Sequence, residues 1–87
     1  REENRKVREF TINELGQMGF ESAESQTNFL FVDIGRSAAE FREACLALGV
    51  LVGRDFPPME KTHARISLGT MEEMQRALEV FRQVLTN

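Results

Sequence analysis

Hydrophobic residues recur at helical spacing in three stretches of the chain, and the first stretch predicts a helix from Glu3 to Met18. Its inward-facing stripe consists of Val7, Thr11, Leu15 and Met18, with Phe10 beside it. Gly19 stands where a helix often ends in a left-handed residue, and Phe20 can supply the apolar contact that accompanies such an ending.

Two later helices are each introduced by a capping box, in which a hydroxyl and a carboxylate three residues apart satisfy the first free amides of a helix. Residues 37–40 (Ser-Ala-Ala-Glu) predict a helix that Gly49 ends. Its buried stripe consists of Ala38, Phe41, Cys45 and Leu48. Residues 70–73 (Thr-Met-Glu-Glu) predict the last helix. That helix is expected to bury Met71, Met74, Leu78, Phe81 and Leu85.

Three shorter runs predict β-strands. Residues 29–34 are rich in aromatic and β-branched side chains, residues 50–53 are mostly apolar, and apolar and polar side chains alternate in residues 64–68. Two connectors are predicted between these elements. Residues 21–28 are polar, and residues 55–63 contain two consecutive prolines, which a sheet ladder does not accommodate.

The order helix-strand-helix-strand-strand-helix predicts an α+β domain with a small three-stranded sheet. A crossover through a helix makes the first and second strands parallel, with a right-handed connection. The third strand then fits between them, antiparallel to both neighbours, which gives a split βαβ sheet of order 1-3-2. The two later helices are expected to cover one face of this sheet.

The second face of the sheet is expected to need a cover as well. Residues 29–34 carry apolar side chains on both sides, whereas a sheet with one solvated face alternates apolar and polar residues. Either the first helix or a partner absent from this chain would cover this second face, and Leu30, Val32 and Ile34 need such a partner if they share it. Arg65 and Ser67 are predicted to lie on this second face, which should be less covered than the helix face in this chain alone.

Composition indicates one soluble domain without nucleic-acid or membrane partners. The 87 residues are 41% hydrophobic and 29% charged, and the net charge of -3 comes from interspersed acids and bases rather than the basic clusters that bind phosphate. No apolar run approaches the ~20 residues that span a bilayer, and no signal-peptide pattern is present, so a cytoplasmic location is expected. Cys45 is the only cysteine, which excludes an internal disulfide and a cysteine-based zinc site, and we expect a buried thiol.

Few side chains are suited to catalysis. His63 is the only histidine and is expected on a loop surface, while Lys6 and Lys61 lie in a charged helical turn and a proline-containing loop. Phosphate-binding loops, dinucleotide fingerprints and nucleophile elbows are absent from the sequence. We therefore expect no catalytic, cofactor-binding or metal-binding residue within the chain itself.

Arg65 is the strongest candidate for a functional residue. One interpretation is a salt bridge to a neighbouring strand, for example through Asp33, or a solvated side chain. The other is bidentate binding of a carboxylate, for which a planar guanidinium on a rigid strand is well suited. The pattern of residues alone leaves both interpretations open.

Three blocks of the sequence carry a resemblance to a known family: "SQTNFLFVDI", "LGVLVGRDF" and "ARISLGTMEEMQRALEVFRQVL". Together they are similar to the C-terminal small domain of fold-type I pyridoxal-phosphate-dependent aminotransferases, and most similar to the histidinol-phosphate aminotransferase group. The resemblance covers essentially all of residues 1–87, with the blocks in the family's order. "RISLGT" followed by a capped helix is its most specific part, and "GVLVGR" its least specific.

The resemblance implies substrate-binding roles for three residues. Arg65 corresponds to the arginine that binds the α-carboxylate of the amino-acid substrate, and Asn28 to an asparagine that helps to order the segment lining the site. Arg54 corresponds to an arginine that contacts the substrate's phosphate in histidinol-phosphate enzymes. Gly53 displaces Arg54 by one position from the family pattern, which leaves open both where Arg54 faces and whether the substrate carries a phosphate.

The resemblance also implies that residues 1–87 are the small domain of a longer enzyme. The chain opens within a helical pattern, without an N-cap residue or an initiator methionine, which favours a segment of a longer polypeptide. The full enzyme would be a cytoplasmic homodimer that transfers an amino group between amino-acid and 2-oxo-acid substrates, with pyridoxal 5′-phosphate held by a large domain absent here. The segment alone would bind no cofactor and catalyse no reaction.

Two other interpretations remain. The chain could be a free-standing α+β module that binds a carboxylate or regulates another protein without catalysis, or a purely structural domain. An initiator methionine and a polar second sheet face would favour these interpretations. A Ser-x-Ser-Lys block upstream of this chain would establish the aminotransferase.

Overall fold

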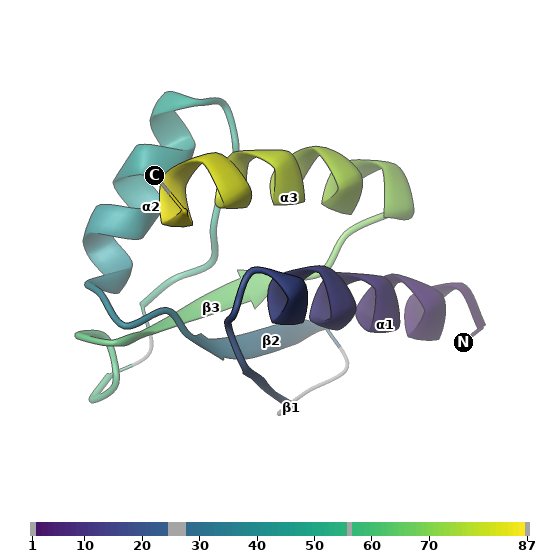
Figure 1. The fold of residues 1–87 in the computed structure, drawn as a ribbon, viewed down its shortest axis with the longest axis horizontal. Coiled ribbons are helices and arrows are strands. Elements are labelled where there is room, and N and C mark those ends of the chain that lie inside the picture. The colour runs from purple at the N-terminus through teal and green to yellow at the C-terminus, as the bar shows by residue number, and fades with distance from the viewer. Residues whose placement is uncertain (1, 25–27, 56, 87) are drawn as a thin grey trace.

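The computed structural model describes residues 2–24, 28–55 and 57–86. Its elements, in chain order, are α1 (Glu2–Gln17), β1 (Ser22–Glu24), β2 (Phe29–Asp33), α2 (Ala38–Ala47), β3 (His63–Ser67) and α3 (Met71–Leu85). Figure 1 shows all three helices on the same side of the sheet, with α1 and α3 next to each other above it. The predicted α+β class is confirmed. Positions 25–27 and 56 of the two predicted connectors lie outside the described residues.

The strand order differs from the prediction. The sheet has the order β1-β2-β3, with β2 in the centre and antiparallel to both neighbours, instead of the split βαβ order 1-3-2. The antiparallel pairing of β2 with β3 was predicted. The predicted polar connector supplies β1, because Ser22–Glu24 pairs with the free edge of β2.

The predicted strand at residues 50–53 is wrong, because this segment forms no regular secondary structure. It does run beside β3, on the edge away from β2. A Cβ added to Gly53 would lie 2.9 Å from the Arg65 carbonyl oxygen and 3.1 Å from Ser67 Oγ. Gly49 and Gly53 bracket the segment, and glycine weakens a strand because it adds no side chain to pack and loses more conformational freedom on folding. Arg65 consequently lies on an outer strand instead of the predicted central one.

The two faces of the sheet differ in burial. Leu30 and Val32 of β2 face the helices together with Ala64 and Ile66 of β3, and all four are almost fully buried. The other face carries Phe29, Phe31, Arg65 and Ser67, which are half-buried or exposed. The prediction that the Arg65 face is less covered is thus confirmed. Leu30, Val32 and Ile34 do not share the Arg65 face and need no partner there, because all three belong to the core on the helix side.

The helix ends follow the predicted signals closely. Gly19 has a φ of 96°, and the Phe20 N–H donates to the Leu15 carbonyl at 2.9 Å. At the start of α3 both bonds of the capping box form: the Glu73 N–H donates to Thr70 Oγ1 at 3.1 Å, and the Thr70 N–H donates to Glu73 Oε1 at 2.9 Å.

The second helix follows its prediction only in part. Ser37 Oγ accepts from the Glu40 N–H at 3.3 Å, but among the described residues the reciprocal bond of a capping box is missing. Leu48, predicted in the buried stripe, is 39% exposed. The reason is that α2 ends at Ala47 and the chain reverses at Gly49, whose φ is 87°, so Leu48 is turned away from the core.

No helix in the described ranges has both the length and the apolar character needed to cross a bilayer.

Candidate functional site

Arg65 lies in the middle of β3 and points from the sheet face opposite to the buried Ala64 and Ile66. Its guanidinium carbon is 4.2 Å from the centroid of the Phe29 ring. Its Nε is buried and has no hydrogen-bond partner in the described part of the chain. The salt bridge to Asp33, one of the interpretations considered for Arg65, is not formed; Asp33 Oδ1 instead accepts from the Gly35 N–H at 3.1 Å.

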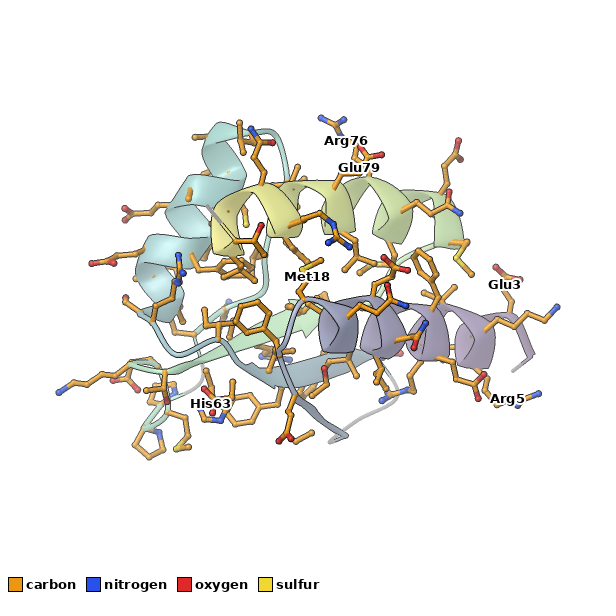
Figure 2. All side chains as sticks on the ribbon, viewed as in Figure 1. Glu3, Arg5, Met18, His63, Arg76 and Glu79 are labelled. Atoms are coloured by element: carbon orange, nitrogen blue, oxygen red, sulfur yellow. The ribbon has the colours of Figure 1, made fainter. Side chains whose placement is uncertain are left out.

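His63 lies on the same face as Arg65, two residues earlier in β3. Its ring stacks on Phe31 with 4.9 Å between centroids and 25° between planes. Its Nδ1 is 2.7 Å from Thr62 Oγ1. Figure 2 shows His63 on the side of the sheet away from the helices. The sequence prediction of a loop surface for His63 was wrong; the alternation of residues 64–68, extended by one residue, would have placed it on the strand.

The register of β2 against β3 sets this geometry. Phe31 is directly opposite Arg65, and Phe29 is opposite Ser67, one step along the same face. Asn28 extends the pairing beyond the strands, because its carbonyl accepts from the Leu68 N–H at 2.8 Å. Asn28 is exposed, and its contact with Leu68 is made through its backbone.

Arg54 is exposed and follows Gly53 in the irregular segment beside β3. Gly53 approaches Arg65 closely: an added Cβ would also lie 3.6 Å from Arg65 Cγ. The next residue, Asp55, forms an ion pair with Arg42 of α2. The described residues show no contact between the side chains of Arg54 and Arg65. The structure therefore brings together Arg65, Phe29 and the Gly53 backbone, with Arg54 at the edge.

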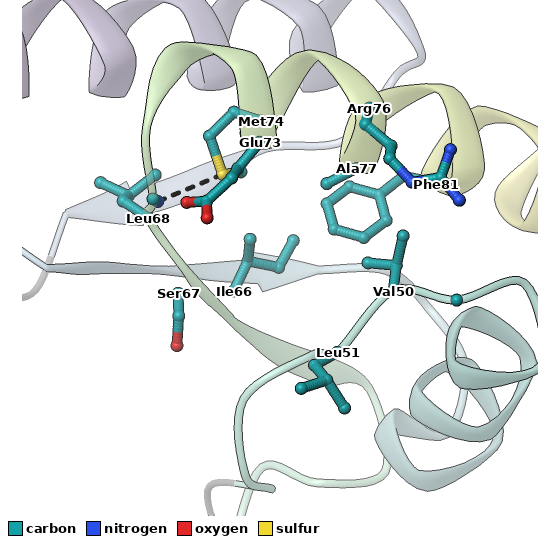
Figure 3. Close-up of a pocket in the computed structure, with 12 residues that line it drawn as sticks. Val50, Leu51, Ile66, Ser67, Leu68, Glu73, Met74, Arg76, Ala77 and Phe81 are labelled. Carbon is teal, nitrogen blue, oxygen red and sulfur yellow. Dashed lines mark hydrogen bonds between the residues drawn. The ribbon is translucent and has the colours of Figure 1, made fainter.

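A separate pocket of about 440 Å³ lies between residues 49–51, the end of β3 and α3 (Figure 3). Its walls are largely apolar, from residues that include Ile66, Met74 and Phe81, and Glu73 and Arg76 also line it. The Gly69 N–H donates to the Met74 sulfur at 3.4 Å across one end. Arg65 does not line this pocket.

Metal-ligating and nucleophilic side chains are sparse among the described residues. No group of three or more His, Cys, Asp or Glu side chains within them could hold a metal ion. Cys45 is buried, and burial raises the pKa of its thiol to about 11, so it stays protonated at neutral pH. Lys6 and Lys61 are both exposed, unlike the desolvated lysines that form Schiff bases.

Comparison with known proteins establishes the family. Residues 1–81 match the family model for aminotransferase class I and II, and the chain belongs to that family. Within the family, it is similar to histidinol-phosphate aminotransferases. It is 42% identical over 67 residues to the histidinol-phosphate aminotransferase of Methanopyrus kandleri, which covers 70% of this chain and 17% of that protein. It is 36% identical over 84 residues to that of Akkermansia muciniphila, covering 97% and 23%.

The fold gives the same result. A crystal structure from Erwinia carotovora atroseptica, assigned to the histidinol-phosphate aminotransferases, superposes with a TM-score of 0.85 at 30% identity. It covers 94% of this chain and 23% of its own. The chain thus spans about a fifth of the length of the curated relatives that it matches.

Proposed function

We propose that residues 1–87 form the substrate-binding small domain of a pyridoxal-phosphate-dependent aminotransferase, in which Arg65 binds the α-carboxylate of the amino-acid substrate. The observation that carries the proposal is the state of Arg65: a half-buried arginine on an uncovered sheet face, with no carboxylate partner among the described residues. Membership of the aminotransferase family supports it. The same membership does not favour a free-standing carboxylate-binding or regulatory module.

The guanidinium can take a carboxylate through its two terminal nitrogens. A planar guanidinium and a carboxylate form two parallel charge-assisted hydrogen bonds. Since Arg65 Nε is buried, a ligand that approaches from the open face meets the Nη1 and Nη2 end of the side chain. The strand pairing of β3 with β2 keeps this end in place before the substrate arrives, which lowers the entropy cost of orienting it.

Asn28 and Arg54 have supporting roles in this proposal. Asn28 holds the end of β2 against β3 through its carbonyl, which supports a role in ordering the segment that lines the site. Arg54 follows the glycine that packs against Arg65, and its exposure suits a second cation for an anionic group of the substrate. Amino-acid and 2-oxo-acid substrates both carry the carboxylate that Arg65 would bind.

The cofactor belongs to the part of the enzyme outside this chain. Pyridoxal 5′-phosphate, when bound, supplies the electron sink of transamination. The described residues do not fit a covalent site for it, because Lys6 and Lys61, the lysines of the chain, are both exposed. The chain's own part is to bind and orient substrate; the lysine would come from a large domain in a cytoplasmic homodimer. The 87-residue chain alone is expected to turn over no substrate.

The experiment is a pair of substitutions in the full-length protein. Arg65→Ala should lower kcat/KM by roughly 30- to several-thousand-fold while the cofactor stays bound, because losing a buried charge-assisted contact costs ~2–5 kcal/mol. Arg65→Lys should recover only part of the loss, since an ammonium lacks the planar fork. Arg5→Ala is the control, because Arg5 is an exposed arginine of α1 that pairs with Glu9. Normal kinetics in Arg65→Ala would contradict the proposal.

A further inference from the structure

The ring of Phe29 lies over the Arg65 guanidinium, whose carbon is 4.2 Å from the ring centroid. We infer that Phe29 is a positioning residue for Arg65: its ring holds the guanidinium in the orientation that receives the substrate's carboxylate. This inference rests on the function proposed above and adds a residue to it. Phe29 would touch Arg65 rather than the substrate.

No described hydrogen bond or ion pair orients the guanidinium. Arg65 Nε is buried without a partner, and no described carboxylate lies within ion-pair distance. A long side chain without such bonds would occupy several rotamers, and each rotamer lost on binding weakens affinity. The aromatic ring restricts this freedom because a cation is attracted to the face of the ring.

A ring also leaves the hydrogen-bond donors available. A carboxylate partner such as Asp33 would accept the guanidinium N–H groups and compete with the substrate for them. An aromatic face attracts the charge through its quadrupole and does not need those N–H groups. Phe29 can therefore position Arg65 without occupying the donors that a bidentate contact uses.

Strand register explains how Phe29 reaches Arg65. Phe29 is opposite Ser67, so it is the diagonal neighbour of Arg65, a separation that aromatic and long side chains bridge. The Leu68 N–H to Asn28 carbonyl bond, at 2.8 Å, fixes the register at this end. The neighbouring residues Asn28 and Phe29 thus act together: Asn28 fixes the pairing of β2 with β3, and Phe29 positions Arg65.

The test uses the full-length protein and compares Phe29→Leu, Phe29→Tyr and Phe10→Leu. Phe29→Leu should raise KM for the amino-acid substrate by between about 2-fold and about 30-fold, the range that a cation–π contact spans, with kcat nearly unchanged. Phe29→Tyr keeps an aromatic face, so its KM should stay close to the wild-type value. Phe10 is a half-buried phenylalanine of α1 on the opposite side of the sheet, so Phe10→Leu should leave KM unchanged.

A fluorinated phenylalanine at position 29 separates electrostatics from packing, because fluorine weakens the negative ring face while the shape is nearly kept. KM should rise with fluorination. An unchanged KM in both Phe29→Leu and the fluorinated protein, with the loss in Arg65→Ala intact, would overturn the role of Phe29 and leave the function of Arg65 standing. Normal kinetics in Arg65→Ala would instead overturn the function of Arg65 and this inference with it.

Discussion

Replacing Gly53 with alanine should loosen the segment that packs against β3. The new Cβ would lie 2.9 Å from the Arg65 carbonyl oxygen and 3.1 Å from Ser67 Oγ. The nearest atom belongs to a paired backbone, which cannot move aside as the end of a flexible side chain can. Overpacking of this kind lowers the free energy of unfolding by ~1–3 kcal/mol. Alanine also restricts the unfolded chain more than glycine does, which raises the free energy of unfolding by ~0.4–1 kcal/mol. We therefore expect a net destabilisation between about 0 and about 2.6 kcal/mol.

Gly16→Ala is the matched control for this substitution. Gly16 lies in α1, and an added Cβ there meets no atom within 4 Å. The same unfolded-state gain and a better helix propensity should stabilise this variant by about 0.5–1 kcal/mol. Urea denaturation of the 87-residue chain, followed by far-ultraviolet circular dichroism, measures both variants. If Gly53→Ala were as stable as Gly16→Ala, residues 50–54 would not pack against Arg65 as described.

Three further substitutions test the core and the helix start. Thr70→Ala should destabilise the chain by ~1 kcal/mol, because α3 loses its capping hydroxyl. Met74→Ala should cost ~2–5 kcal/mol, because the Met74 side chain is only 3% exposed. If denaturation midpoints showed the larger loss for Thr70→Ala, the start of α3 would be misplaced. Burial raises the pKa of Cys45 from 9.0 to about 11, so the folded protein holds the thiol proton more tightly than the unfolded chain does. The protonated thiol therefore contributes stability that is fully present below pH 9 and is lost as the pH rises through about 11. Cys45→Ala should therefore make the unfolding midpoint less dependent on pH in the alkaline range. If the pH profile of the midpoint were unchanged in this variant, the thiol would not cause the loss of stability.

The sequence predicted the features whose signals are local. Gly19 and Gly49 ended their helices with positive φ, and Thr70 began α3 with a complete capping box. The alternation around Arg65 correctly assigned that side chain to the less covered face. These outcomes depend on a few neighbouring residues, so the chain encodes them within a short window.

Features that depend on distant parts of the chain were missed. Ser22–Glu24 becomes a strand only because the edge of β2 is free to pair, and nothing in three polar or small residues announces that. Residues 50–53 have the composition of a strand, and Gly53 lies close to β3. They nevertheless form no regular strand beside it. The contact of Phe29 with Arg65 likewise depends on the β2–β3 register, which a single strand does not reveal.

The most direct test of the function of Arg65 compares two substrates in two proteins. One substrate is the preferred amino acid, the other is the amine that lacks its carboxylate, and kcat/KM is measured for both in the full-length wild-type protein and in Arg65→Ala. If Arg65 binds the carboxylate, the substitution lowers kcat/KM for the amino acid by roughly 30- to several-thousand-fold and leaves the amine nearly unaffected. An equal loss for both substrates would contradict carboxylate binding and assign Arg65 a structural role.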